Sequence, residues 1–187
     1  MGKVLATVLV LVAFAAAPAR AQKSAEVQTP PDASIRLKGL DGKMYDTAEM
    51  RGQVIVASFG ATWCVPCVWE LKALEEVIEE YSGKPVKFLW VSIEEKERTS
   101  DTLLKNYAKM YRLTMPVLRD EDGSAFAQFS SSRRIPLVVF FDKEGRFDAP
   151  THRGMTQDTI KYKEMLRQRI DALLAAGEQK KEADSTR

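Results

Sequence analysis

The stretch QVIVASFGATWCVPC, residues 53–67, decides the fold of this chain. Its first seven residues are mostly apolar and β-branched, which is typical of a strand buried on both faces of a sheet. Two cysteines, Cys64 and Cys67, follow it. Apolar residues then recur three and four positions apart as far as Tyr81, which predicts a helix. A buried strand therefore leads directly into a helix that a pair of cysteines opens.

Outward from this stretch, strand patterns and helix patterns alternate along the chain. Asp41-Gly42 and residues 142–145 predict the turns of two hairpins, and Gly177 predicts the end of the last helix. We expect strands at 35–38, 44–45, 53–59, 86–93, 116–118, 136–141 and 146–147, and helices from the cysteines to 82 and over 99–112, 124–129 and 156–177. This order implies an α/β fold with a mixed central sheet flanked by helices, because the late hairpin adds antiparallel pairing.

The two ends of the chain differ in composition from its middle. Lys3, the apolar run 4–17 and Ala19-Arg20-Ala21 fit a secretory signal peptide cleaved near Ala21. The alternative is an uncleaved N-terminal membrane anchor, although the run is shorter than the roughly 20 apolar residues of a spanning helix. We therefore expect an exported protein. Its parts are a signal peptide at 1–21, a flexible lead-in at 22–34, one domain at 35–177 and a disordered charged tail at 178–187.

The balance of charge excludes one large class of function. The chain has 28 Lys and Arg residues against 26 Asp and Glu residues. Loss of Lys3 and Arg20 with the signal peptide leaves 26 against 26, so the mature protein is close to neutral. A nucleic-acid-binding protein needs a clustered basic face. We expect no nucleic acid among the partners.

The spacing of Cys64 and Cys67 points to redox chemistry. A cysteine at the start of a helix faces free backbone N–H groups and the positive end of the helix dipole, and both lower the pKa of its thiol. The thiolate is the nucleophile in disulfide exchange. We therefore interpret Cys64 as the nucleophile and Cys67, nearly one turn later, as the resolving cysteine. Pro66 fits the first turn, where a missing N–H costs nothing.

Four other interpretations of the cysteine pair stay open. A structural zinc site needs four ligands, and His152 is the only other strong candidate in the sequence. An inert local disulfide would constrain little chain, because its loop is so short. Two soft thiolates also suit Cu(I) binding, and a thiol peroxidase would use one reactive cysteine. We expect no metal and no cofactor beyond a redox-active Cys64–Cys67 disulfide.

Two motifs resemble those of a known family. FGATWCVPC, residues 59–67, is similar to the active-site segment of the thioredoxin superfamily, and most similar to that of the TlpA/ResA-like branch of exported thiol–disulfide oxidoreductases. RIPLVVFFDKEG, residues 134–145, resembles the second signature of that branch. The resemblance covers roughly residues 35–175. It implies a thioredoxin-like fold with an N-terminal β-hairpin and a central insert.

The resemblance also implies roles for particular residues. Cys64 and Cys67 would form the redox pair, and Pro136 would follow a cis peptide bond beside them. Ile135 would offer its backbone groups to an extended substrate chain, and Trp63 would shield one side of the reactive sulfur. The implied enzyme is a monomeric periplasmic reductase of partner-protein disulfides. Its partners would belong to cytochrome c biogenesis or copper-oxidase maturation, and a membrane thiol donor would supply its electrons.

This sequence departs from the family pattern beside the cysteines. Ser58 stands where many thioredoxins carry a buried acid, so Cys67 must exchange its proton with water or another group. Gly60 stands where a bulky aromatic residue is common, which opens space beside the site. Glu94 and Glu95 follow a strand at the same sheet edge. Our first interpretation of both is solvated charges entering a loop, and the alternative is a proton-transfer group.

Overall fold

A five-stranded sheet forms the centre of the protein. The computed structural model describes residues 30, 32–155 and 158–185. The strand order is β5-β4-β3-β6-β7, with β3, β4 and β5 parallel and β6 and β7 antiparallel to their neighbours. The strands are β3 (Val54–Gly60), β4 (Val86–Ser92), β5 (Val117–Arg119), β6 (Leu137–Phe141) and β7 (Phe147–Arg153). The apolar first half of the deciding stretch is therefore the middle strand, and every residue of β3 is buried.

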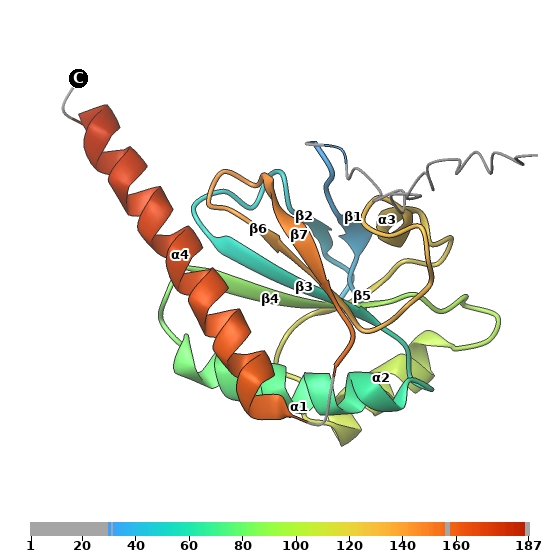
Figure 1. Cartoon of the computed structure of the whole chain (residues 1–187). Helices are drawn as coiled ribbons and strands as arrows, with labels where there is room; N and C mark the ends of the chain where they lie inside the picture. Colours follow the sequence, from blue (N-terminus) through green and yellow to red (C-terminus); the bar gives the residue numbers. More distant parts are fainter. Residues whose placement is uncertain (1–29, 31, 156–157, 186–187) are drawn as a thin grey trace, which may run out of the picture.

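One face of the sheet is covered by the N-terminal hairpin and a short helix. The hairpin pairs β1 (Arg36–Lys38) with β2 (Met44–Asp46), and the short helix is α3 (Ser124–Ala127). Aromatic side chains fill the space beneath them. The ring of Phe59 contacts those of Phe126 and Phe129, with centroids 5.5 and 5.8 Å apart. Figure 1 shows the hairpin and α3 on the side of the sheet opposite to α1.

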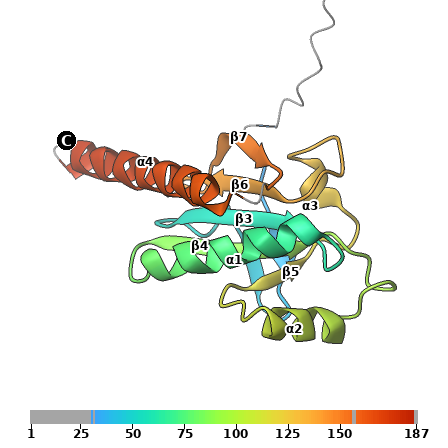
Figure 2. The same ribbon diagram turned by 60° about the horizontal axis from the view of Figure 1, so that its bottom comes forward.

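Three helices cover the other face. They are α1 (Val65–Glu80), α2 (Asp101–Met110) and α4 (Thr159–Ser185), of which α1 and α4 pack together. On α1 the buried positions recur three and four residues apart, as the sequence predicts. In Figure 2, α4 crosses beside β3 and β6 and projects beyond the edge of the sheet. The arrangement confirms the expected α/β fold with a mixed sheet, flanking helices and an N-terminal hairpin.

Most predicted element ends are confirmed within a few residues, but those of the last strand and the last helix are wrong. The strand expected at 146–147 continues to Arg153. Ser100 caps α2 by accepting a hydrogen bond from Leu103 N–H at 3.2 Å, and Gly42 adopts φ 86° in the predicted turn. The predicted helix end at Gly177 fails because α4 continues to Ser185. Glycine disfavours a helix by only about 1 kcal/mol, and the following residues, EQKKEAD, are mostly good helix formers. Most of the segment expected to be a disordered tail is therefore helical.

The N-terminal segment lies outside this description. The predicted signal peptide at 1–21 and most of the lead-in at 22–34 fall on residues that the structure does not describe. In the described part of the chain, no helix combines the length and the apolar character that a membrane crossing requires.

Candidate active site

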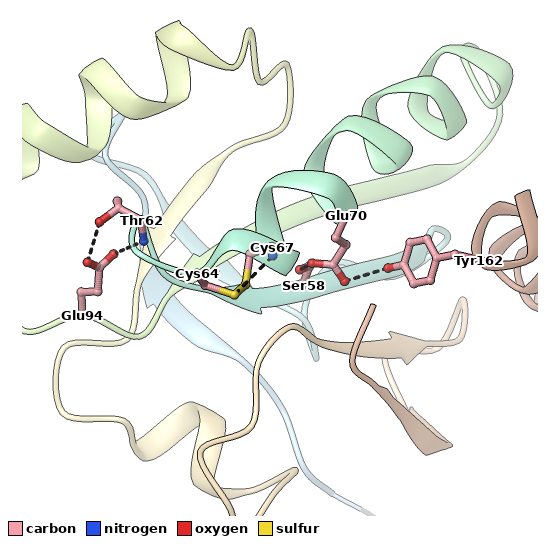
Figure 3. The surroundings of a disulfide bond; sticks show 7 residues. All are labelled: Ser58, Thr62, Cys64, Cys67, Glu70, Glu94 and Tyr162. Atoms are coloured by element: carbon pink, nitrogen blue, oxygen red, sulfur yellow. Dashed lines mark hydrogen bonds between the residues drawn. A yellow bond between two sulfur atoms is a disulfide. The ribbon is translucent and has the colours of Figure 1, made fainter. Parts of the chain in front are cut away.

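Cys64 and Cys67 are joined by a disulfide bond at the start of α1. Figure 3 shows this bond where the chain turns from β3 into the helix. The sheet places it there because β3 ends at Gly60 and α1 begins at Val65, so four residues make the connection. The fold therefore brings together the strand, the helix start and the cysteine pair as the sequence predicts.

Cys64 is the N-cap residue of α1. Its sulfur accepts a hydrogen bond from the backbone N–H of Cys67 at 3.2 Å, in the way an N-cap oxygen does elsewhere. Pro66 lies in the first turn, as predicted. The free N–H groups and the dipole of a 16-residue helix both favour negative charge at this sulfur. The arrangement can therefore stabilise a thiolate on Cys64 when the disulfide is reduced.

The two cysteines differ in what surrounds them. Cys64 is 5% exposed and Cys67 is fully buried, whereas the flanking Trp63 and Val65 are 69% and 61% exposed. Large apolar side chains that stand in solvent beside a nearly buried sulfur form an apolar rim. A partner chain can contact this rim while it reaches the edge of the Cys64 sulfur, but it has no access to Cys67.

Ile135 and Pro136 directly precede β6. The peptide bond between them is cis, as the resemblance implies. Pro136 is buried, and Ile135 is half-buried and packs against the core cluster that contains both cysteines. The carbonyl of Pro136 accepts a hydrogen bond from Gly154 N–H. Among the described residues, none forms a backbone hydrogen bond with Ile135, so its peptide groups are free to pair with another chain.

Glu94 is the residue for which our first interpretation is wrong. It is only 7% exposed, and its carboxylate accepts hydrogen bonds from the backbone N–H and the hydroxyl of Thr62, both at 2.8 Å. The hydroxyls of Ser92 and Thr99 donate to the same carboxylate. Glu94 thus fixes the loop before the cysteines. Glu95 is exposed and pairs with Arg98, as a solvated residue does.

Glu70 is the site residue that sequence reasoning missed. It is fully buried on α1, three residues after Cys67, and therefore on the same face of the helix one turn on. Ser58 donates a hydrogen bond to Oε2 at 2.6 Å, and Tyr162 donates to Oε1 at 2.7 Å (Figure 3). Burial raises the pKa of Glu70 to about 7, although both hydrogen bonds oppose the shift. Glu70 can therefore bind and release a proton near neutral pH.

One signal in the sequence pointed to this group. Glu70 occupies a position of the buried face of α1, next to Leu71 and one turn before Leu74, so an acid stands where the pattern requires an apolar residue. Ser58 stands on the strand where many thioredoxins carry a buried acid, and here it is the hydrogen-bond partner of Glu70. The buried acid of this site therefore comes from the helix instead of the strand.

His152 is neither a loop residue nor part of a ligand cluster. It lies in β7, half-buried, with its ring centroid 5.6 Å from that of Tyr162. Burial and the nearby charge of Arg169 lower the pKa of His152. Across the described ranges, no group of three or more His, Cys, Asp and Glu residues is placed to hold a metal ion.

Fold and site together define a protein of the thioredoxin-like class with a disulfide at the N-terminus of its first long helix. The chain belongs to the AhpC/TSA family, whose model matches residues 28–149. This finding confirms the resemblance drawn from the two motifs.

Curated relatives carry names from the same branch. The chain is 30% identical over 109 residues to the thiol-disulfide oxidoreductase ResA of Bacillus thuringiensis subsp. konkukian, covering 57% of this chain and 59% of the relative. It is 35% identical over 98 residues to the thioredoxin-like protein YneN of Bacillus subtilis, covering 52% and 55%. The chain thus matches less than two thirds of the length of these relatives.

Solved structures share the fold. StoA from Bacillus subtilis superposes with a TM-score of 0.57 at 21% identity, covering 73% of this chain and 97% of that one. A thiol:disulfide interchange protein of the thioredoxin family from Chlorobium tepidum gives a TM-score of 0.62 at 21% identity, covering 80% and 99%. At this level of identity, the similarity establishes the thioredoxin-like architecture.

Proposed function

We propose that the chain is a periplasmic thiol–disulfide oxidoreductase that reduces disulfides of partner proteins. The observation that carries this proposal is the Cys64 sulfur at the N-cap of α1, hydrogen-bonded by Cys67 N–H and joined to the Cys67 sulfur. Such a position favours the thiolate, which is the reactive form in disulfide exchange. The name of the 30% identical relative, a thiol-disulfide oxidoreductase, supports the same activity.

The reaction is a two-step exchange that starts from the reduced enzyme. The Cys64 thiolate attacks one sulfur of a partner disulfide, that disulfide breaks, and the other partner sulfur leaves as a thiolate. The Cys67 thiolate then attacks the Cys64 sulfur of the mixed disulfide and displaces the second partner sulfur. Two electrons pass to the partner, and the enzyme is left with the Cys64–Cys67 disulfide seen in the structure.

Glu70 provides the proton acceptor that the second step needs. Cys67 is fully buried, so its thiol must lose a proton without bulk water. Glu70 lies one turn further on the same helix face with a pKa of about 7, and Ser58 hydrogen-bonds its carboxylate from the neighbouring strand. A group that titrates near the working pH is best suited to accept and return a proton.

The partner binds as an extended chain across the rim of the site. The free backbone groups of Ile135, which packs against the core cluster that contains both cysteines, pair with it as an added strand would. By resemblance, Pro136 flanks the sulfurs. Trp63 and Val65 contribute exposed apolar surface. Since backbone pairing does not depend on sequence, the enzyme accepts more than one protein. By resemblance, these partners belong to cytochrome c biogenesis or copper-oxidase maturation, with a membrane thiol donor that reduces the enzyme again.

Trapping of mixed disulfides tests the roles of the two cysteines. Cys67→Ala lacks the resolving thiol and is expected to accumulate covalent complexes with its partners in the periplasm, which a reductant dissolves. Cys64→Ala lacks the attacking thiol and is the matched control, because Cys67 is buried out of reach. Complexes with Cys64→Ala and none with Cys67→Ala would reverse the assignment.

The direction of electron flow is tested by the reduction potential. Equilibration of the Cys64–Cys67 pair with a thiol buffer of known potential is expected to give a value near that of thioredoxin, about −270 mV. A value near that of the strong oxidants, about −120 mV, would contradict the reductase direction. Rapid peroxide consumption, or tight one-to-one Cu(I) binding that blocks exchange, would instead favour one of the two other activities considered for the cysteine pair.

A further inference from the structure

The indole N–H of Trp90 is a buried donor without an acceptor. Trp90 lies in β4 and is fully buried, and among the described residues no atom accepts a hydrogen bond from its Nε1. Its ring stacks on Tyr107 of α2 with centroids 5.4 Å apart, so the indole is held in place by packing. Buried donors normally have partners, because an unpaired one is costly.

The N–H group and the Cys67 sulfur border the same small space. Gly60 has no side chain there, and a Cβ on Gly60 would lie 2.8 Å from Trp90 Nε1 and 3.4 Å from Cys67 Sγ. The sheet explains this approach, since Trp90 pairs with Ser58 and is therefore diagonal to Gly60 on the face covered by α1. The indole Nε1 and the Cys67 sulfur therefore both approach the position that a side chain on Gly60 would occupy.

Cys67 needs a donor more than Cys64 does. The Cys64 sulfur already accepts a hydrogen bond from a backbone N–H at the helix start. Cys67 is fully buried, and a buried thiolate is strongly disfavoured unless a donor stabilises it. Yet exchange requires that Cys67 become a thiolate for the moment in which it attacks the mixed disulfide.

We propose that the Trp90 indole N–H is the hydrogen-bond donor of the Cys67 sulfur once the disulfide is opened, in the space that Gly60 leaves free. Trp90 then stabilises the Cys67 thiolate while the proton leaves, and the bond is released when the Cys64–Cys67 disulfide reforms. The inference rests on the proposed exchange reaction and adds no electron or proton to it. Trp90 acts on the reacting sulfur alone.

Other titratable groups on this side of the sheet must be separated from the effect of Trp90. They are Cys64 at the N-cap of α1, Glu70 on α1, Tyr107 on α2, Tyr162 on α4 and Glu94 after β4. Glu70 is the one invoked for proton transfer. The effect of Trp90 is therefore measured both with Glu70 present and in Glu70→Gln, and it is expected to persist in both.

The test is the pKa of the Cys67 thiol, measured by thiolate ultraviolet absorbance in protein carrying Cys64→Ser. Trp90→Phe keeps an aromatic ring on Tyr107 but removes the donor, and is expected to raise this pKa by about one pH unit. Tyr107→Phe is the matched control. It removes the other unpartnered buried polar atom of the described residues, on the ring that stacks on Trp90, and is expected to leave the pKa unchanged.

Two further measurements keep the proposal testable if Trp90→Phe folds poorly. Gly60→Ala fills the shared space and is expected to raise the Cys67 pKa in the same direction. In wild-type protein, the indole N–H resonance of Trp90 is expected to shift on reduction. An unchanged pKa in Gly60→Ala together with an unshifted resonance would overturn the proposal, as would an equal rise in Tyr107→Phe. None of these readouts needs a partner protein, so an inactive wild-type enzyme would refute the proposed function and leave this inference standing.

Discussion

At the scale of single residues, Glu70 couples the stability of the protein to pH. Its pKa is about 7 in the folded chain against an ordinary value of 4.5, because burial disfavours the charged form. Between these two values the folded protein holds a proton that the unfolded chain has released. The contribution of Glu70 to stability is therefore complete below pH 4.5, falls as the pH rises towards 7 and stays low above it. The loss amounts to about 3 kcal/mol.

Glu70→Gln is expected to remove this pH dependence. The amide keeps the shape of the side chain and has no charge to bury, so the free energy of unfolding in urea should differ little between pH 5 and pH 8. Wild-type protein is expected to lose about 3 kcal/mol more than the variant over the same interval. Glu79→Gln, at an exposed position of α1, is the matched control and should follow the wild type. Parallel curves for all three proteins would contradict the assignment.

The residue scale also shows where the sequence was informative. Cys64, Cys67 and Pro66 were identified because their spacing and neighbours carry their chemistry, whereas Pro136 was identified only through the resemblance to a known family. Glu70 and Trp90 were not, because each depends on a residue of another element, namely Ser58 of β3 and Gly60 of β3. The helix pattern marks Glu70 as an acid on an apolar face, but its partner Ser58 and the unpartnered indole of Trp90 can be identified only after the helix and the two strands are placed in space.

At the scale of elements, Glu94 joins two loops at one edge of the sheet. The loop from β3 to α1 contributes Thr62, and the loop from β4 to α2 contributes Thr99. Arg119 of β5 reinforces the same junction by donating to the backbone oxygens of Glu94 and Thr99. The loop from β3 to α1 is therefore held in place by contacts with the loop from β4 to α2 as well as by its own sequence.

Glu94→Ala is expected to destabilise the protein and to loosen the active-site loop. It leaves the Thr62 N–H and several hydroxyl groups without their acceptor, which costs about 3 kcal/mol in the free energy of unfolding. Amide hydrogen exchange should become faster at 61–63. Glu95→Ala is the control, because its ion pair with Arg98 is exposed and is expected to change stability by less than about 0.5 kcal/mol. Equal effects of the two substitutions would refute the role of Glu94.

The order of elements was predictable, whereas their termination was predictable only where a local signal exists. Ser100 as a helix cap and Gly42 as a turn residue act within a few residues, and both are confirmed. Gly177 gave a similar signal and was wrong, because α4 continues through it to Ser185. Gly177 lies against the side chain of Lys143, which belongs to the connection between β6 and β7. The residues around Gly177 in the sequence give no sign of this contact.

At the scale of the whole molecule, α4 closes the buried acid off from solvent. Tyr162, Leu166 and Ile170 are buried in the core that α1 shares with the sheet, and Tyr162 binds Glu70 directly. The Lys143 ammonium donates to the carbonyl of Leu174. Beyond this point Glu178 and Gln179 are exposed. The first half of α4 therefore belongs to the active-site architecture.

Truncation of α4 should reveal a sharp boundary between these two halves. A chain that ends at Gly177 is expected to keep its free energy of unfolding within about 0.5 kcal/mol and its rate of disulfide exchange, because it retains the buried contacts of Tyr162, Leu166 and Ile170. Leu166→Ala in the full chain is the contrasting variant. The cavity that it leaves is expected to lower the free energy of unfolding by about 3 kcal/mol. Urea denaturation of both proteins provides the measurement. A large loss of stability on truncation at Gly177 would place the end of the domain further along the helix than the buried contacts of Tyr162, Leu166 and Ile170 indicate.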